Sequence, residues 1–237
     1  MRKTNWEEND MVNKYSKEMM QDMSNRIRKF IKENKRTPNY ITATTTTGKT
    51  IQIQKPTYAG LFEAQNRFIL NNGRYPNYVS EVHTANNPII MDYQDTTYTC
   101  APASLAMAIQ YLYGYESEQK LRTICKTVTG KGTDPQKLVN GAKTIGYKLT
   151  IIPRTIQGIK KSIDEYKPII AHIDTLKETC LGYSKKKNFG HYILIWNIDG
   201  TYIKVADPLR GIKTVKASCI INAQYNRKIN FYSVEIA

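Results

Sequence analysis

A cysteine directly before an apolar helical run is the residue of this sequence best placed to act as a nucleophile. Cys100 precedes the stretch APASLAMAIQYLY, in which Pro102 suits the first turn of a helix and the residues after it favour its continuation. A thiol at a helix N-terminus lies at the positive end of the helix dipole, which favours the reactive thiolate. The sequence therefore predicts thiol chemistry at Cys100, whereas we expect Cys125 and Cys219 to be small buried hydrophobes, the alternative role for any such thiol.

Thiol catalysis also needs a base within hydrogen-bond reach of the sulfur. The candidates are His83 in a segment without clear periodicity, His172 within the strand-like PIIAHID, and His191 at the start of GHYILIWNIDGTYIKVADPLRG. We expect a structural role for His172, because its neighbours are those of a buried strand. His191 is therefore the predicted base.

The residues after His191 predict a hairpin that brings a carboxylate to its side. Asp199-Gly200 is a turn signal, and a three-residue loop 198–200 with glycine in the left-handed position pairs His191 with Asp207. In that register one face carries His191, Ile193, Ile195, Ile203, Val205 and Asp207. Directly opposite residues have Cβ atoms ~4.5–5.5 Å apart, which suits a contact from the His191 Nδ1–H group to the Asp207 carboxylate.

The orienting group of the base has alternatives in the same hairpin. A two-residue loop would place Asp207 opposite Tyr192 and loosen the pairing with His191. Asn197 and Asp199 could also orient an imidazole, although they lie at the far end of the hairpin.

Gln94 is the predicted donor for a developing oxyanion. It lies six residues before Cys100, in DYQDTTYTC. Its side-chain amide and the Cys100 backbone N–H can donate together to the oxygen of a tetrahedral intermediate. A glutamine in a polar loop means little alone, and it acquires this role only together with Cys100 and His191.

These residues need a scaffold in which a helix comes first and an antiparallel sheet follows. The expected elements are helices at 101–113, about 134–145 and 156–166, strands at 147–152, 168–174, 191–198 and 201–207, and a basic loop at 175–190. The segment 81–91, EVHTANNPIIM, has no clear period, so we place a domain boundary there. The part that follows is predicted to be α+β.

The part that precedes it contains a repeat. FIKENKRTPNYI (30–41) and FILNNGRYPNYV (68–79) align at a period of 38 with seven identities in twelve. Apolar residues at helical spacing precede each copy, so each is predicted to be a helix that ends before an R-x-P-N-Y turn, because proline cannot continue a helix. The threonine-rich TATTTTGKTIQIQ between them suits either a weak hairpin or a mobile loop.

Charge and cysteine usage narrow the possible partners and compartments. A formal net charge of +15 over 237 residues predicts an acidic partner: nucleic acid, an anionic membrane or an anionic polymer. Four cysteines at spacings of 25, 55 and 39 match neither a zinc knuckle nor a disulfide framework, which predicts reduced thiols. No segment reaches the ~18 uninterrupted apolar residues of a membrane span, and no export signal is visible. We expect a protein made in the cytoplasm without a signal peptide.

The order of these motifs resembles the papain-like superfamily of cysteine peptidases. Q-x5-C-A-P-A-S-L, G-H-Y-I-L-I-W and V-A-D-P-L-R-G, over about residues 90–210, are most similar to the branch that contains bacteriocin-leader-processing peptidases. The R-x-P-N-Y copies resemble pseudomurein-binding repeats. Together the two modules resemble pseudomurein endoisopeptidases, which are lysins of viruses and prophages of methanogenic archaea.

The resemblance implies an organisation, a substrate and roles for residues. It implies a small, mainly helical pseudomurein-binding repeat domain at 1–82, with repeats at about 10–43 and 58–80, and a papain-like cysteine peptidase domain at 83–237. The implied reaction cleaves the isopeptide bond between alanine and a lysine ε-amine in pseudomurein, in the archaeal cell wall, after release from the producing cell. Nucleophile, base, orienting acid and oxyanion donor would be Cys100, His191, Asp207 and Gln94.

The sequence departs from that family at two points and leaves others open. Ala101 stands where relatives often have glycine after the nucleophile, and only two repeats are evident where relatives can have more. The mechanism implied by the resemblance requires no cofactor, and dependence on a divalent cation stays open. Roles for Cys180 and for the lysine run at 185–187, which could guide an anionic strand or be a solvated loop, stay open as well.

Two other functions fit parts of the sequence. One is a leader-processing or transglutaminase-like thiol enzyme with another acyl donor. The other is a non-catalytic protein that binds the cell wall or nucleic acid, but the chain lacks the aromatic-glycine and zinc patterns of common nucleic-acid modules, so no nucleic-acid partner is expected.

Overall fold

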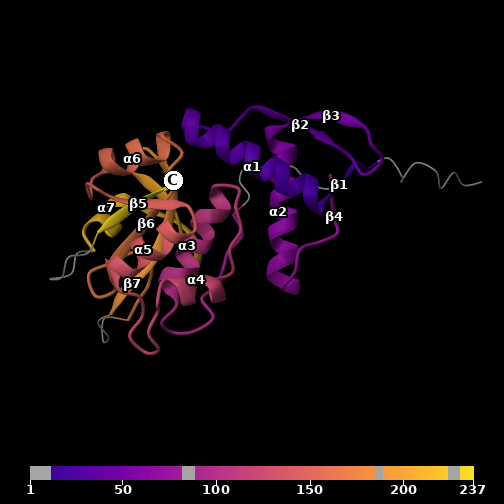
Figure 1. Ribbon diagram of the computed structural model, residues 1–237. Helices are drawn as coiled ribbons and strands as arrows, with labels where there is room; N and C mark the ends of the chain where they lie inside the picture. Colours follow the sequence, from indigo (N-terminus) through magenta and orange to yellow (C-terminus); the bar gives the residue numbers. More distant parts are fainter. Residues whose placement is uncertain (1–11, 82–88, 185–188, 224–229) are drawn as a thin grey trace, which may run out of the picture. The chain divides into compact units, whose positions relative to one another are not determined.

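The computed structural model describes residues 12–81, 89–184, 189–223 and 230–237 (Figure 1). The chain divides into two compact units, residues 1–27 with 38–88 and residues 28–37 with 89–237. Most of the expected boundary segment 81–91 lies outside the described residues, as do His83 and the lysine run at 185–187. Every predicted site residue belongs to the second unit.

The N-terminal part of the chain consists of two helices and four short strands. In chain order these are β1 (Lys14–Ser16), α1 (Lys17–Asn34), β2 (Tyr40–Thr44), β3 (Thr50–Gln54), α2 (Lys55–Asn72) and β4 (Tyr78–Ser80). The threonine-rich segment is the hairpin β2–β3, so the first of its two predicted conformations is confirmed. The helices bury apolar side chains at helical spacing: Met20, Met23, Ile27, Tyr58, Leu61, Phe62 and Ile69.

The two repeats adopt the same local structure around their turns. Gly73 ends α2 with a positive φ of 65°, and Lys35, at the equivalent position 38 residues earlier, follows α1 with a φ of 54°. The amide of each donates to a carbonyl four residues before it, at 2.8 and 2.9 Å. Both turns are therefore left-handed helix ends, of the kind that the sequence KRTPN and GRYPN predicts.

Each repeat also completes the other. Strand β3 before the second helix pairs with β2 of the first repeat, and β1 before the first helix pairs with β4 of the second repeat. The Asn39 carbonyl accepts from Lys55 N at the start of α2, at 2.8 Å, and the Asn77 carbonyl accepts from Lys17 N at the start of α1, at 3.2 Å. Two repeats thus supply each other's helix caps and strand partners.

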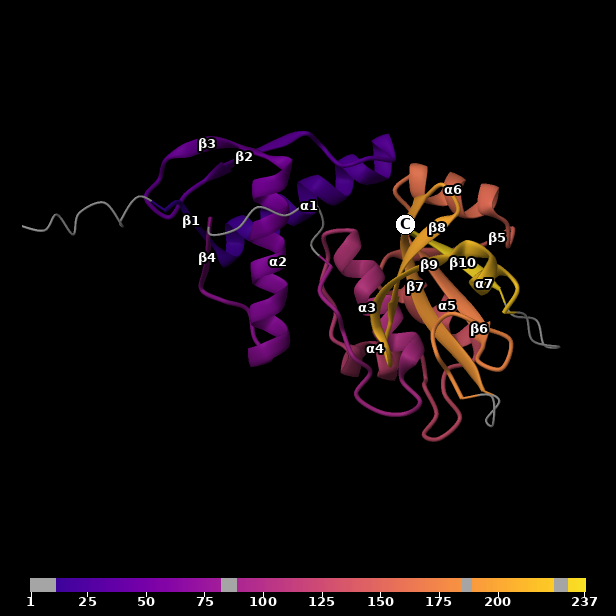
Figure 2. The same ribbon diagram turned by 180° about the vertical axis from the view of Figure 1, so that it is seen from behind.

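The C-terminal part of the chain is a six-stranded antiparallel sheet with helices on both faces (Figure 1, Figure 2). Its elements are α3 (Cys100–Tyr111), α4 (Glu118–Ile124), α5 (Pro135–Thr144), β5 (Tyr147–Ile152), α6 (Ile156–Asp164), β6 (Ile169–Asp174), β7 (Gly190–Asp199), β8 (Tyr202–Asp207), β9 (Gly211–Lys216), α7 (Ala217–Ile221) and β10 (Phe231–Ile236). The strand order is β5-β10-β6-β7-β8-β9. The α+β class is confirmed.

The central strands are buried on both faces, and this fixes which side chains meet. Alternate residues of β6, β7 and β8 form one core with α6 and α7: Ile169, Ala171, Ile173, Ile193, Ile195, Ile203 and Val205. The residues between them, such as Ile170 and Leu194, are equally buried and face α3. The sheet thereby holds the N-terminus of α3 near the ends of β7 and β8.

The expected helices and strands of this part are all present, with ends that differ by a few residues. The strand at 147–152 is β5 with the predicted bounds, and the predicted helix at 134–145 is α5, capped by the Asp134 side chain. Elements α4, β9, α7 and β10 were not predicted. The last of these comes from the end of the chain and inserts between the edge strand β5 and β6. Within the described residues, none of the helices combines the length and apolar character needed to cross a bilayer.

Candidate active site

Cys100 is the first residue of α3, as its sequence predicts. Every residue of this helix is buried, which fixes the helix firmly against β7. Cys100 is 8% exposed and lines a cleft, from which a substrate can reach the thiol. A buried helix thus presents its N-terminal thiol, with the unpaired N–H groups of the first turn, at the edge of the core.

His191 and Asp207 meet at adjacent ends of β7 and β8. The His191 Nε2 atom lies 2.8 Å from the Asp207 Oδ1 atom, and both side chains are at most 1% exposed. The His191 side chain also hydrogen-bonds to Cys100. The structure therefore brings together three of the four predicted site residues, in the order thiol, imidazole and carboxylate.

The predicted hairpin register is wrong, although the shared face is right. Gly200 and Thr201 form a two-residue turn between Asp199 and Tyr202, and a bulge lies between Ile195 and Asn197. The bulge shifts the pairing so that His191 lies diagonally, not directly, across from Asp207. The turn is one residue shorter than predicted, and the bulge adds one residue to β7. The two changes compensate, so His191 and Asp207 still lie on the same face of the hairpin.

The structure corrects one detail of the predicted imidazole contacts and agrees with the sequence on the two rival groups. Asp207 binds Nε2 of His191 and not the predicted Nδ1, which leaves Nδ1 for the Cys100 thiol. The rival groups Asn197 and Asp199 lie exposed at the other end of β7, paired with Lys204 and Tyr202. Neither is placed to orient His191.

The surroundings of His191 favour its protonated form. Burial alone lowers the pKa of an imidazole, but the charge of Cys100 and the hydrogen bond and charge of Asp207 raise the pKa of His191 to about 9. Burial acts to raise the pKa of Asp207, yet its contacts with His191, Leu209 N and Tyr183 hold that pKa below its usual value. At neutral pH the site therefore holds an imidazolium between a carboxylate and a sulfur atom.

The raised pKa of His191 predicts how activity and stability depend on pH. Activity should fall about tenfold per pH unit above about 9, because His191 then lacks the proton that a leaving amine requires. Stability should follow the same group: its contribution is complete below about 6.5 and is lost as pH rises through about 9. A pH series of hydrolysis rates and melting temperatures checks both limbs, and a rate still rising at pH 10 would contradict the assignment.

Gln94 lies close to the site but is not joined to it through its side chain. Its backbone N–H donates to the Pro208 carbonyl at 3.2 Å, beside Asp207. Its side-chain NH₂ donates to the Thr96 carbonyl within its own loop, and its side-chain oxygen is buried without a hydrogen-bond partner. One N–H of the amide thus remains for another acceptor, so the predicted oxyanion role stays a prediction.

Tyr183 is a neighbour of the site that the sequence reasoning missed. Its hydroxyl donates to the Asp207 carboxylate at 2.8 and 2.9 Å, and its ring meets the His191 ring edge-on at 5.3 Å. It lies in the expected basic loop at 175–190, where no periodicity marks a buried residue. The available signal was a pair of aromatic residues, Tyr183 and Phe189, in a lysine-rich loop.

A cleft of about 500 Å³ opens at the Cys100 thiol. Its lining comprises Cys100, Val128, Lys131, Gly132, Thr133, Asp134, Pro135, Lys137, His172, Gly190 and Tyr192. His172 stacks on Tyr192 with ring centroids 4.1 Å apart, and burial, followed by the charges of His191 and Arg154, lowers the His172 pKa to about 4. His172 is therefore a neutral wall residue near physiological pH, which agrees with the structural role its sequence predicts.

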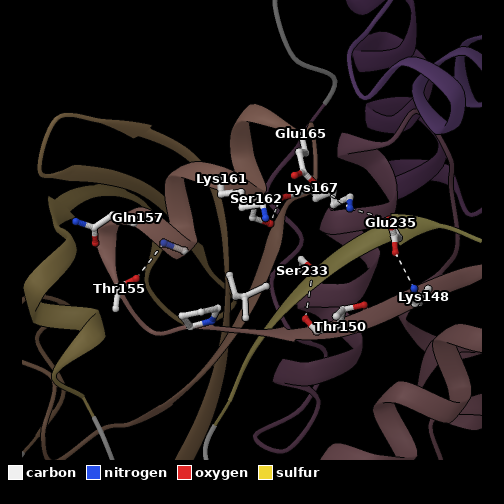
Figure 3. Close-up of a pocket in the computed structure, with 13 residues that line it drawn as sticks. Lys148, Thr150, Thr155, Gln157, Lys161, Ser162, Glu165, Lys167, Ser233 and Glu235 are labelled. Atoms are coloured by element: carbon white, nitrogen blue, oxygen red, sulfur yellow. Dashed lines mark hydrogen bonds and ion pairs between the residues drawn. The ribbon is translucent and has the colours of Figure 1, made fainter.

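A second cavity, of about 520 Å³, lies between α6 and the strands β5 and β10 (Figure 3). Lys167 is bound there by Glu165 and Glu235, and Glu235 also binds Lys148. Most of its charged groups thus neutralise one another. None of the four predicted site residues lines it, so the cleft at Cys100 is the candidate active site.

The other thiols differ from Cys100 in their surroundings. Burial raises the pKa of Cys125 to about 12. Burial and a contact with the Cys219 thiol raise the pKa of Cys180 well above its usual value. None of the described residues form a group of three His, Cys, Asp or Glu side chains that could hold a metal ion. Cys100 is thus the thiol that lies beside an imidazolium.

A thiol hydrogen-bonded to an imidazole that is itself held by a carboxylate can attack a carbonyl carbon and form an acyl-enzyme. The family model described as "Peptidase C39 family" matches residues 88–230, more than half of the chain. The chain belongs to the peptidase C39 family. It is a papain-like cysteine peptidase, and the match covers the elements that carry Cys100, His191 and Asp207.

Solved structures resemble the C39 peptidase part of the chain. A C39-like peptidase from Bacillus anthracis is 15% identical with a TM-score of 0.50, over 63% of this chain and 96% of that one. The peptidase domain of Streptococcus ComA, a bifunctional ABC transporter involved in quorum sensing, is 19% identical with a TM-score of 0.47, over 62% and 96%. A double-glycine-motif protease from an AMS/PCAT transporter is 18% identical with a TM-score of 0.46, over 64% and 92%. At these identities the likeness shows the fold alone, and no curated protein matches the chain.

Proposed function

We propose that this C39 peptidase is a lysin that hydrolyses the alanine–lysine isopeptide bonds of archaeal pseudomurein, acting on the wall after release from the cell. One observation carries the proposal: a single chain combines a C39 peptidase domain with two R-x-P-N-Y repeats. We assign wall binding to residues 1–82 and catalysis to residues 83–237.

The paired repeats support a role in binding a polymer. Tyr40 and Tyr78 occupy equivalent positions in the strand pairs and are exposed to nearly the same extent, 52% and 51%. Arg36 lies over the Phe30 ring at 5.1 Å, and Arg74 lies over the Phe68 ring at 5.2 Å. A duplicated basic and aromatic turn suits a ligand that itself repeats, because the second contact forms at high effective concentration.

The charge of the chain supports an anionic substrate. The net charge of +15 would concentrate the protein on a polymer with uronic acid and acidic peptide groups. Lys131 and Lys137 line the cleft at Cys100, while the Asp134 carboxylate there accepts the backbone N–H groups of Gln136 and Lys137 and caps α5. The two lysines are therefore placed where a substrate carboxylate can pair with them.

The proposed reaction uses the site residues in two steps. The Cys100 thiolate attacks the alanine carbonyl carbon, and His191 gives its proton to the lysine ε-amine as the carbon–nitrogen bond breaks. His191 then takes a proton from water, which attacks the thioester and frees the alanine carboxylate and the thiolate. Asp207 holds the His191 ring in place throughout and stabilises its imidazolium form whenever it is protonated, and Gln94 with the Cys100 N–H donates to the tetrahedral oxygen.

The direct test is digestion of purified pseudomurein sacculi with end-group analysis. We expect lysine ε-amines and alanine carboxyls to appear in equal amounts, while the turbidity of the suspension falls. Cleavage of soluble peptides by an enzyme that leaves sacculi unchanged would favour the other thiol peptidases. Tight, strongly salt-dependent DNA binding with an unreactive Cys100 would favour a non-catalytic protein.

The role of Gln94 makes a separate prediction. Gln94→Ala should lower kcat by about 10²–10³-fold on a short alanine–lysine isopeptide with little change in KM, because an oxyanion donor acts mainly in the transition state. Steady-state kinetics checks this. Gln136→Ala, which changes an exposed glutamine on α5, serves as the matched control. An equal loss in both variants, or a rise in KM alone for Gln94→Ala, would reject the role.

A further inference from the structure

The Asp207 carboxylate receives donors from three parts of the chain. His191 Nε2 and Leu209 N each lie 2.8 Å from Oδ1. The Tyr183 hydroxyl contacts both oxygens, at 2.9 Å to Oδ1 and 2.8 Å to Oδ2. Tyr183 is thus the donor that reaches the second oxygen of the carboxylate, and it fixes the rotation of the group that holds His191.

The Tyr183 ring is itself confined on several sides. The Arg210 guanidinium lies over it at 5.0 Å, and the Phe189 ring meets it edge-on at 5.7 Å. His191 contributes the edge contact already described. Because Phe189 and Arg210 flank the ends of β7 and β8, the hydroxyl is directed at the carboxylate by residues adjacent to the site.

A buried carboxylate holds the backbone that carries Tyr183. Glu178 is 0% exposed, and its two oxygens accept the N–H groups of Cys180, Leu181 and Tyr183 at 2.9, 2.6 and 3.0 Å. An ionised carboxylate away from water is costly unless such donors surround it. The loop therefore wraps around Glu178, and Lys213 Nζ binds the Leu181 carbonyl at 2.8 Å from β9.

We propose that Tyr183 and Glu178 are positioning residues of this peptidase. Glu178 shapes the loop at 178–183, the Tyr183 hydroxyl holds the Asp207 carboxylate, and Asp207 in turn holds the His191 imidazolium beside Cys100. The proposal rests on the catalytic roles proposed above for these three residues. It does not depend on which amide bond is the substrate.

The hydroxyl has a predictable effect on the protonation of the site. A donor to a carboxylate stabilises the anion, so its removal makes Asp207 easier to protonate. Protonated Asp207 no longer stabilises the His191 imidazolium. As the pH falls, the reactive pair of Cys100 thiolate and His191 imidazolium is therefore lost at a higher pH than in the unchanged protein. On the acid side of the pH profile, activity falls as this pair is lost, and we call this fall the acid limb. A residue with only a packing role would change the rate or the stability without moving the acid limb.

Tyr183→Phe is the decisive variant, because it removes one oxygen atom and keeps the ring. We expect kcat on a soluble isopeptide to fall about 10–100-fold with KM unchanged, the range for one lost hydrogen bond to a charged group. The acid limb of the pH profile should move to higher pH. The same shift should appear in the rate at which iodoacetamide alkylates Cys100, a readout that needs no substrate. Tyr202→Phe, at an exposed position of β8, is the matched control.

Glu178→Gln tests the second half of the proposal and provides a separate route if Tyr183→Phe folds poorly. It should shift the acid limb in the same direction, and the double variant should be no worse than the more impaired single variant, because both residues act through the same contact. An unmoved acid limb in both single variants overturns the proposal, even if kcat falls. Additive losses in the double variant, or an equal shift in Tyr202→Phe, also overturn it. Failure to cleave pseudomurein with the alkylation shifts intact would reject only the proposed substrate.

Discussion

Replacing Cys100 with alanine is expected to lower the release of lysine ε-amines from sacculi by at least about 10⁴-fold. The reason is that no other thiol can substitute for it: Cys125 is buried, Cys180 contacts Cys219, and none of these three thiols lines the cleft at Cys100. Removal of one small side chain at the first residue of α3 should leave the fold intact. Binding to sacculi, which we assign to the repeats, should be unchanged.

Cys219→Ala is the matched control for this result, since it makes the same substitution at a partly exposed thiol. Its hydrolysis rate should match that of the unchanged protein. Sedimentation of each variant with sacculi separates binding from cleavage. If Cys100→Ala still releases amines, the nucleophile is misassigned, and if it no longer binds, binding is not a property of the repeats alone.

Replacing His191 with alanine should have the second largest effect, about 10³-fold or more on kcat. The leaving amine then lacks its proton donor, and the sulfur lacks the imidazolium that stabilises its charge. Alkylation of Cys100 by iodoacetamide at pH 7 should slow about tenfold or more, with a steeper increase towards high pH. Timed alkylation followed by peptide mass spectrometry measures this directly.

The control for His191→Ala is Asn197→Ala, further along the same strand at an exposed position. It should alter neither hydrolysis nor alkylation, because the structure places Asn197 opposite Lys204 and away from the site. Rapid alkylation of Cys100 in His191→Ala at pH 7 would show that the imidazole does not activate the thiol. The general-base role would then have to be abandoned.

Local sequence patterns were sufficient to predict the elements that carry the site. A proline and a run of small apolar residues mark the start of α3 at Cys100, and alternating isoleucines mark β7. Asp207 was placed on the same face as His191 because side chains alternate along strands. These signals are local, so one sequence contains them.

The register of the hairpin could not be read in the same way. The bulge near Trp196 changes the pairing by one residue, and bulges respond to the twist and packing of a whole sheet. The predicted register is therefore wrong, but the prediction that His191 and Asp207 share a face is correct. The turn is one residue shorter than predicted, and the bulge compensates by adding one residue.

The contributions of Tyr183 and Glu178 depend on contacts between distant residues. Tyr183 meets Asp207 from 24 positions away, and Glu178 resembles any charged residue of a basic loop until the backbone folds around it. Similarly, β10 comes from the end of the chain and inserts between β5 and β6. Periodicity within a segment carries no information about such partners.

The repeat has features that the sequence predicts and features that depend on distant contacts. Its period of 38 predicted two helices with the same ending, and Lys35 and Gly73 have the same left-handed conformation. The exchange of caps, Asn39 to Lys55 and Asn77 to Lys17, depends on the pairing of the copies with each other. The sequence alone does not reveal that two copies are enough to complete the pairing.

The most direct test of acyl transfer through Cys100 is the mass of the enzyme during turnover. Digestion of pseudomurein fragments, stopped in acid within the first turnovers, should leave a fraction of the protein heavier by one alanine-terminated acyl group. Fragmentation should locate that group on the sulfur of Cys100, and the Cys100→Ala protein should show no such adduct. An adduct at another residue, or steady release of amines with the Cys100 thiol free of any acyl group under conditions that trap thioesters, would contradict acyl transfer through this thiol.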